Sequence, residues 1–253
     1  MKKNIFALSV TALLFTSIAI VSCKKDVAPD PTPKAAVVAT NSFSEEFDNV
    51  GDIAAKGWLI KNNSDPAGAS AWRQGRYENN LGGNKAGKVI GMPAYSASQT
   101  PYDFISADAT SVNDRGNINC WLISPQTTVK NGDVLSFYTR AMDDSDWNNF
   151  AKDNMQVRAN FVDGSSDCGV NATDFGKFTR LLLEMNPTYA NNAATAAPLG
   201  YPQVWTLKTI VIAGLAAPTK ARFAFRFLAT DGGLSGTVGT SLIGIDKLEF
   251  KSN

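Results

Sequence analysis

The chain has 253 residues, of which 44% are hydrophobic, and its formal net charge is +1. This composition fits one large globular domain or two small ones, and the near-neutral charge gives no basic footprint for nucleic acid. The sequence contains no histidine, which excludes Ser-His-Asp and Cys-His nucleophile systems and histidine-ligated zinc, copper or non-haem iron. A glycosidase that works with two carboxylates passes this filter, because it needs only Asp and Glu.

The N-terminus has the pattern of a bacterial export signal. Two lysines precede an apolar run over residues 5–21, as in secretion signals. A run of this length also fits one membrane-spanning helix, which needs about 20 apolar residues. The motif Ile20–Cys23 decides between them, because it resembles the lipobox of bacterial lipoproteins. We therefore predict a signal peptide at residues 1–22 and a lipid anchor on Cys23 that holds the protein in a membrane.

A short tether follows the predicted anchor. Residues 23–42 contain Pro29, Pro31 and Pro33, and such segments are extended and semi-rigid. The lysines and aspartate after Cys23 resemble lipoprotein starts in Bacteroidota, which predicts an outer-membrane lipoprotein. We expect it at the cell surface, and a periplasm-facing anchor is left open. The folded domain is expected at residues 43–253.

Two cysteines remain in that domain. Cys120 lies in an apolar predicted strand, and Cys168 lies in a polar turn. Export permits a disulfide between them. A disulfide and two separate thiols are therefore both left open.

Short stretches of alternating or continuous apolar residues recur between turns that are rich in Gly, Asn, Thr and Ser. The clearest is residues 220–230, in which Ala221, Phe223, Phe225 and Phe227 share one face. Residues 93–116 are expected to be a long polar connection, and residues 186–203 a polar insertion. Strands are predicted at residues 43–48, 57–60, 71–75, 89–92, 118–124, 134–141, 155–162, 177–184, 205–213, 220–230 and 241–251.

This pattern predicts an all-β domain. Many short strands joined by turns, with no convincing amphipathic helix, indicate a two-sheet sandwich, for which we choose the jelly-roll type. The first and last strands commonly lie side by side in such folds. Trp58, Trp72 and Trp121 lie in or beside strands and are expected to pack in the core or on a sheet face.

The last predicted strand contains a carboxylate on its apolar face. Asp246 alternates in phase with Leu248 and Phe250, and Glu45 lies in the same way between two phenylalanines of the first strand. An unpaired carboxylate in the core costs several kcal/mol. The two side chains therefore predict a shared Ca²⁺ site, since calcium takes oxygen ligands. The alternatives are a salt bridge to an arginine or a bulge that turns Asp246 outward.

Two further groups of residues are candidate sites. Asp48, Asp65 and Asp153 are secondary candidates for the calcium shell. The acidic, aromatic loop at residues 143–150 is a candidate ligand-contact loop, or a solvated loop whose tryptophan folds back onto the sandwich. In this loop, Trp147 and Phe150 are expected to stack on a sugar ring or to contact a peptide. Asp144 and Asn148 are expected to form hydrogen bonds with the ligand.

An ordered set of motifs resembles the choice-of-anchor J lipoproteins and the related cleaved-adhesin (haemagglutinin) modules of gingipain proteases. The resemblance implies a jelly-roll sandwich that binds structural calcium, with Glu45 and Asp246 at the matching positions, and that captures ligands without catalysis. Two features depart from it, namely the reduced acidic turn at residues 62–65 and the large insertion at residues 186–203. The motifs are Glu45-Glu46-Phe47-Asp48, Gly57-Trp58, Trp72, Trp121-Leu122-Ile123-Ser124-Pro125, Leu135-Ser136-Phe137-Tyr138 and Ile245-Asp246-Lys247-Leu248-Glu249.

These observations predict a lipid-anchored, calcium-stabilised module that binds an extracellular glycan or protein and is not an enzyme. A carboxylate-dependent glycoside hydrolase and a structural subunit of a surface complex are the alternatives.

Overall fold

The computed structural model describes residues 41–79, 87–143, 152–191 and 200–253. The predicted signal peptide, Cys23 and most of the predicted tether lie outside these residues. So do four predicted ligand contacts, Asp144, Trp147, Asn148 and Phe150. Within the described parts, no helix is long and apolar enough to cross a membrane.

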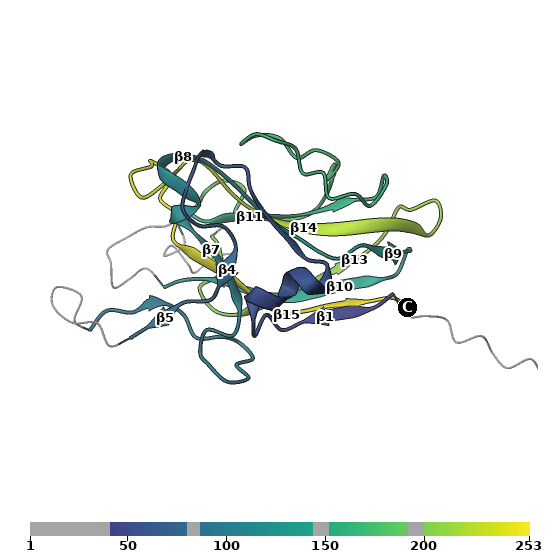
Figure 1. Cartoon of the computed structure of the whole chain (residues 1–253), viewed down its shortest axis with the longest axis horizontal. Coiled ribbons are helices and arrows are strands. Elements are labelled where there is room, and N and C mark those ends of the chain that lie inside the picture. The colour runs from purple at the N-terminus through teal and green to yellow at the C-terminus, as the bar shows by residue number, and fades with distance from the viewer. Residues whose placement is uncertain (1–40, 80–86, 144–151, 192–199) are drawn as a thin grey trace, which may run out of the picture. The chain divides into compact units, whose positions relative to one another are not determined.

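The domain is a sandwich of two antiparallel sheets (Figure 1), which confirms the predicted all-β fold. Sheet A consists of β1 (Phe43–Glu45), β4 (Arg73–Gln74), β7 (Ile105–Asp108), β10 (Val134–Ala141), β13 (Thr206–Val211) and β15 (Leu242–Lys251). Sheet B consists of β2 (Leu59–Asn62), β3 (Asp65–Ala67), β8 (Val112–Ile123), β9 (Thr127–Val129), β11 (Asn154–Asn160), β12 (Arg180–Met185) and β14 (Thr219–Gly233). The remaining elements are a small hairpin of β5 (Tyr77–Glu78) and β6 (Ile90–Gly91), and the 3₁₀ helices η1 (Val50–Lys56) and η3 (Ala109–Ser111).

The strand order brings the two ends of the domain together. Sheet A runs β13-β10-β15-β7-β4, and β1 pairs with β15. Sheet B runs β12-β11-β14-β8-β2, with β3 on β8 and β9 on β14. In the β1–β15 pair, Glu45 lies opposite Leu248. The first and last strands are therefore neighbours, as the sequence predicts.

Phenylalanines from both sheets form the centre of the core. Phe223, Phe225 and Phe227 of β14 are fully buried, as their alternation predicts. The ring of Phe137 meets Phe225 edge-on at 5.0 Å, and Phe223 lies 5.3 Å from Phe250. Aromatic pairs at such distances add to the stabilisation from buried area.

One strand lies where a loop was expected. The prediction of a polar connection over residues 93–116 is wrong for its second half, because β7, η3 and the start of β8 occupy residues 105–116. All four residues of β7 are buried: Ile105 and Ala107 belong to the core between the sheets, and Ser106 and Asp108 are buried polar residues. Apolar and polar residues alternate over only four positions here, which is the shortest length at which this pattern indicates a strand.

The last strand contains a bulge that changes the orientation of Asp246. Ser136 of β10 pairs with Glu249, but Tyr138 pairs with Asp246, and Lys247 between them has a φ of 46°. One extra residue reverses the alternation along a strand. Asp246 therefore points away from the core that contains Leu248. The predicted core-facing Asp246 is wrong, and the bulge is the alternative that the structure adopts.

The cysteines lie on opposite faces of sheet B. Cys120 belongs to the main core between the sheets, whereas Cys168 packs against Trp121 on the outer face. Both are buried and free. The open question of their pairing is thus resolved as two separate thiols.

The outer faces of the two sheets are covered differently. On sheet B, Phe178 and Trp121 lie 5.7 Å apart and are both fully buried, and Phe175 stacks 4.4 Å below the guanidinium of Arg158. The outer face of sheet B is thus closed by its own chain at this point. On sheet A, the segment 93–104 crosses the outer face at Asp246, and several aromatic side chains beside it stay accessible.

Candidate functional site

Asp246 fastens the segment 93–104 to sheet A. One carboxylate oxygen, Oδ2, accepts the N–H groups of Tyr95 at 2.8 Å and Ser96 at 3.0 Å. The other, Oδ1, accepts the N–H of Lys247 at 2.7 Å and the hydroxyl of Ser96 at 3.3 Å. Asp246 is fully buried. A buried carboxylate is tolerated when hydrogen bonds replace its hydration, and these four donors do so.

A second carboxylate approaches the same hydroxyl. Ser96 Oγ lies 2.6 Å from Glu46 Oε2, so Glu46 and Asp246 share one hydroxyl group. Burial raises the pKa of Asp246 to about 6, although its bonds from N–H groups act in the opposite direction, and the charge of Glu46 raises it further. The ionised pair therefore places two like charges beside each other.

This arrangement makes part of the stability depend on pH. The pKa of Asp246 is higher in the folded than in the unfolded protein, so the folded state holds the extra proton between about pH 4 and pH 6. The free energy of unfolding should fall by at most about 3 kcal/mol as pH rises through this window. Urea unfolding at a series of pH values from 4 to 7 measures this fall in the free energy of unfolding. The Asp246→Asn variant should lack this fall, and an equal fall in both proteins would contradict the assignment.

The two predicted calcium ligands do not meet. Glu45 faces the core side of sheet A, where its Oε1 pairs with Lys56 Nζ at 2.9 Å. Asp246 lies opposite Tyr138 on the outer face. Its contacts are N–H and O–H donors, whereas calcium needs six to eight oxygen ligands. The residues present therefore do not fit a Ca²⁺ site shared by Glu45 and Asp246.

The secondary calcium candidates are dispersed. Asp48 is exposed beside β1, and Asp65 is exposed on β3 of sheet B. Asp153 is fully buried and accepts the N–H and hydroxyl of Ser241 at 2.9 and 2.6 Å. Among the residues that the structure describes, no three His, Cys, Asp or Glu side chains are grouped to hold a metal ion.

Three aromatic side chains form a shelf beside Asp246. The ring of Tyr95 stacks on Tyr138 of β10, with centroids 3.7 Å apart and planes 15° apart, and Trp205 lies 6.5 Å from Tyr95. Trp205 Nε1 donates to Pro93 O at 2.9 Å, which ties it to the same segment. We call Tyr95, Tyr138 and Trp205 the aromatic shelf. Tyr95 is 42% exposed, and Leu207 of β13, opposite Tyr138, is 51% exposed.

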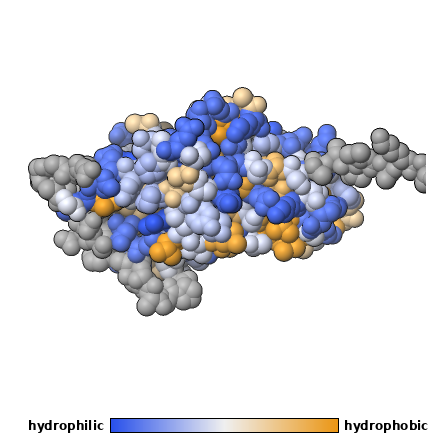
Figure 2. Space-filling view, turned by 90° about the horizontal axis from the view of Figure 1, so that it is seen from below, coloured by the Kyte–Doolittle hydropathy of each residue, from blue (hydrophilic) through white to orange (hydrophobic). Residues whose placement is uncertain are grey.

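Small apolar areas are a feature of this side of the molecule. Figure 2 views it from below Figure 1, the side on which β15 and β1 lie, and shows hydrophobic residues in separate patches between hydrophilic ones. Isolated apolar residues are ordinary on a protein surface. The ordered stacking of the shelf therefore singles it out, rather than its hydrophobicity.

A polar pocket of about 440 Å³ lies farther along the segment 93–104. Asp103 accepts the N–H groups of Ser98, Gln99 and Thr100 at 2.7 to 3.0 Å, and these bonds, with those from hydroxyls, hold its pKa far below the usual range despite burial. Gln74 Nε2 donates to Tyr102 O at 2.7 Å, which anchors the segment to β4. The pocket is lined by Asp48, Asn49, Gln74, Ser98, Gln99, Thr100, Tyr102 and Asp103.

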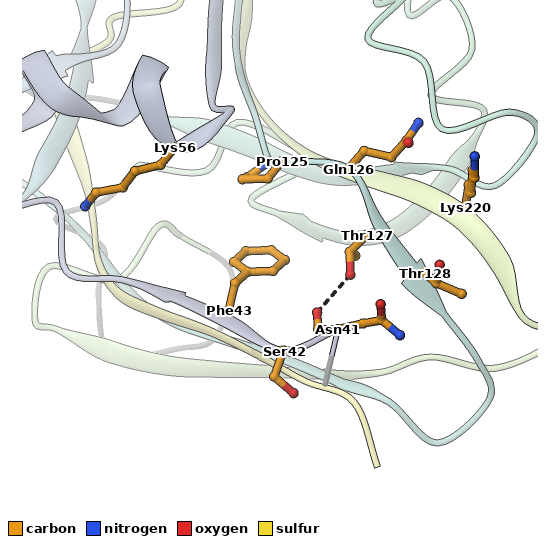
Figure 3. Close-up of a pocket in the computed structure, with 9 residues that line it drawn as sticks. All are labelled: Asn41, Ser42, Phe43, Lys56, Pro125, Gln126, Thr127, Thr128 and Lys220. Atoms are coloured by element: carbon orange, nitrogen blue, oxygen red, sulfur yellow. Dashed lines mark hydrogen bonds between the residues drawn. The ribbon is translucent and has the colours of Figure 1, made fainter. Parts of the chain in front are cut away.

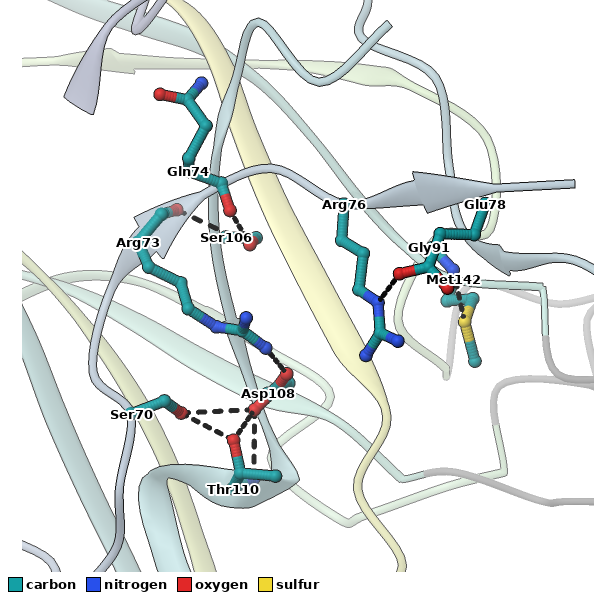
Figure 4. Close-up of polar contacts among 10 residues, drawn as sticks. All are labelled: Ser70, Arg73, Gln74, Arg76, Glu78, Gly91, Ser106, Asp108, Thr110 and Met142. Carbon is teal, nitrogen blue, oxygen red and sulfur yellow. Dashed lines mark hydrogen bonds and ion pairs between the residues drawn. The ribbon is translucent and has the colours of Figure 1, made fainter. Parts of the chain in front are cut away.

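A larger cavity, of about 480 Å³, lies near the end of β7. Its charged groups are already engaged, as Figure 4 shows: Asp108 pairs with Arg73 and accepts the N–H of Thr110 at 2.9 Å, and Arg76 pairs with Glu78 at 2.6 Å. Its lining includes Met142, which precedes the predicted ligand-contact loop at residues 143–150. Residues 144–150 of that loop lie outside the described residues, so the assignment to Trp147 and Phe150 stays a prediction.

A third cavity, of about 370 Å³, lies where the tether joins the domain. Figure 3 shows its lining of the first described residues together with Thr127, Lys56 and Lys220. Thr127 Oγ1 donates to Asn41 O at 2.8 Å. Lys56 is engaged by Glu45, and the other lysine of the lining, Lys220, is exposed.

The strongest site residues were missed by the sequence analysis. Tyr95 and Tyr102 stand in the predicted polar connection, and Glu46 stands next to the favoured Glu45. Aromatic residues in a long polar connection were the available signal. Their place beside Asp246 could not be read from local pattern.

No protein-family model and no curated protein sequence matches this chain. Solved structures with similar folds include the K1 cleaved adhesin domain of Lys-gingipain from Porphyromonas gingivalis W83, at 20% identity over 84% of this chain and 98% of that one, with a TM-score of 0.47. The K3 cleaved adhesin domain has 17% identity over 83% and 98%, with a TM-score of 0.46. The xylan-binding module CBM15 has 13% identity over 77% and 95%, with a TM-score of 0.31. Similarity this weak carries no inference about family or ligand.

Proposed function

We propose that the domain is a non-catalytic glycan-binding module whose ligand lies on the outer face of sheet A. The observation that carries this proposal is the aromatic shelf: Tyr95 is stacked on Tyr138, exposed to solvent and held from beneath through its own N–H by Asp246. A sugar ring presents an apolar C–H face, which packs on an aromatic ring.

The shelf is built in advance of binding. Asp246 fixes the backbone of Tyr95 and Ser96, and Trp205 is bonded to Pro93 of the same segment. A rigid aromatic surface loses little side-chain entropy when a ligand binds. The ordered shelf therefore supports recognition rather than packing alone.

The proposal extends to the location of the protein. A lipid anchor on Cys23 and a proline-containing tether would present the module at the outer-membrane surface, where an extracellular glycan is within reach. This part is supported by the N-terminal sequence alone.

Removing the ring of Tyr95 should weaken glycan binding by about 10- to 100-fold, since truncation of a central interface aromatic costs about 2 kcal/mol or more. Screening on a glycan array, followed by isothermal titration of the best neutral oligosaccharide, compares the wild type with Tyr95→Ala. Val204→Ala, which removes an exposed apolar side chain outside the shelf, is the matched control and should bind as the wild type does. Undiminished binding by Tyr95→Ala would contradict the proposal.

Hydrolysis is the alternative that needs a specific check. Glu46 and Asp246 meet at Ser96, and a pair of carboxylates is the minimum for a glycosidase. Asp246 is fully buried, however, and both its oxygens are occupied by donors, so it cannot reach a glycosidic bond. Incubation with the bound oligosaccharide should therefore release no shorter product, and turnover that is lost in Glu46→Gln would favour the hydrolase.

A further inference from the structure

The aromatic shelf and the polar pocket adjoin each other. Ser96 lies beside the shelf, at Asp246, and Ser98, two residues later, lines the pocket. The segment that follows β1 shows the same spacing, because Glu46 meets Ser96 and Asp48 lines the pocket. Two residues of extended chain span at most about 7 Å. The separation is therefore on the scale of one sugar ring.

The chemistry of the pocket differs from that of the shelf. Its lining side chains carry carboxylates, amides, hydroxyls and one phenol ring, and none of them is a lysine or arginine. Tyr102 is 43% exposed, and its ring offers a second stacking surface. Amides and carboxylates are the groups that hydrogen-bond sugar hydroxyls.

Of the two carboxylates that line this pocket, that of Asp48 is the free one. Its exposed carboxylate has no hydrogen-bond partner among the described residues, whereas the carboxylate of Asp103 is already occupied by N–H and O–H donors. Two negative charges with no lining cation repel an anionic ligand. The pocket thus favours a neutral, hydroxyl-rich group over an anionic one.

We propose that the shelf and the polar pocket form one continuous track for a neutral oligosaccharide, with one sugar stacked on Tyr95 and an adjoining sugar hydrogen-bonded by Asp48 beside Tyr102. This inference rests on the proposed glycan-binding function and adds to it a ligand charge and a minimum length of two sugar residues.

The number of sugar residues in the oligosaccharide is the variable that tests whether the shelf and the pocket form one track. The probes are gluco-, xylo-, galacto- and manno-oligosaccharides from monosaccharide to hexasaccharide, measured by isothermal titration. For the preferred series, wild-type affinity should rise at least about tenfold from the monosaccharide to the trisaccharide, since the second sugar gains a hydrogen bond to a charged group. Asp48→Asn should lose most of this rise in affinity between the monosaccharide and the trisaccharide. Tyr102→Ala should act in the same way.

Matched controls separate this inference from the broader function. Asp65→Asn changes an equally exposed aspartate on sheet B and should keep the full rise. If Tyr95→Ala abolishes binding but Asp48→Asn and Tyr102→Ala keep the rise, the continuous track is overturned and the proposed function stands. If no glycan binds, both are overturned.

Charge gives the second readout. Uronic-acid and sulfated oligosaccharides of the same length should bind at least about tenfold more weakly than neutral ones, and neutral binding should change little with added salt. Preference for the anionic series would overturn the assignment. So would capture of a lysine-rich peptide, lost at high salt, in place of the neutral series, since the pocket would then recognise a cation.

Discussion

Replacing Asp246 by alanine should lower the free energy of unfolding by about 3 kcal/mol or more and abolish glycan binding. The substitution leaves the N–H groups of Tyr95, Ser96 and Lys247 without their acceptor. Each unsatisfied buried donor costs about 1–3 kcal/mol. For a domain of this size the loss corresponds to a fall in Tm of roughly 6–12 °C. Thermal and urea unfolding, with titration of the preferred oligosaccharide, measure both effects.

Two variants refine that experiment. Asp246→Asn keeps the shape and one acceptor oxygen, so its loss of stability should be smaller. Glu46→Gln changes the neighbouring carboxylate without removing the acceptor of the three N–H groups, and it should leave Tm nearly unchanged. A wild-type Tm for Asp246→Ala would contradict the anchoring role.

The same measurement tests the calcium prediction. If N–H donors alone stabilise Asp246, the wild-type Tm should be equal in EDTA and in calcium. A calcium site would raise the Tm with calcium, because a ligand that binds only the folded state adds to its stability. A lower Tm in EDTA that disappears in Asp246→Ala would restore calcium at this residue.

Truncating Trp58 to alanine should be at least as damaging to stability, at about 3–5 kcal/mol, because it opens a large cavity in the core. Trp58 is 2% exposed, and its ring meets Phe47 edge-on at 5.3 Å and Phe43 at 6.1 Å. Phe43 in turn contacts Phe250 at 5.5 Å. The loss should therefore loosen β1 against β15 and lower the urea midpoint.

Trp205→Ala is the matched comparison for Trp58→Ala. Trp205 is only partly buried and belongs to the shelf. It should cost much less stability and weaken glycan binding instead. Equal losses of stability in the two variants would show that the shelf is part of the core, and it would remove the basis for a binding role.

Local pattern predicted the elements in which alternation is undisturbed. The bounds of β10 coincide with the predicted segment 134–141, and the phenylalanines of β14 face the core as expected. The agreement at β10 and β14 has one cause: the side chains of a strand alternate between its faces whatever the rest of the chain does. Segment 177–184 was predicted as a strand from its neighbours instead, and β12 occupies Arg180–Met185.

The same rule failed where one strand has an extra residue relative to the strand it pairs with. Alternation places Asp246 with Leu248, but the bulge against β10 reverses its phase. The bulge needs a positive φ at Lys247, a residue type that gives no sign of it. β7 was missed for a different reason, because its alternation covers only four residues, the shortest length that indicates a strand.

The sequence by itself determined that this protein is a β-sandwich and which strands form most of its core, since those properties follow from a local two-residue period. The adjacency of the first and last strands was a hypothesis from what is common in such folds, and the structure confirms it. Only the tertiary structure decided which groups contact Asp246. The N–H groups of Tyr95 and Ser96, about 150 residues earlier in the chain, donate to its carboxylate. Glu45 lies on the other face of the sheet. Contacts over such separations depend on the packing of the whole sandwich, which no local pattern encodes.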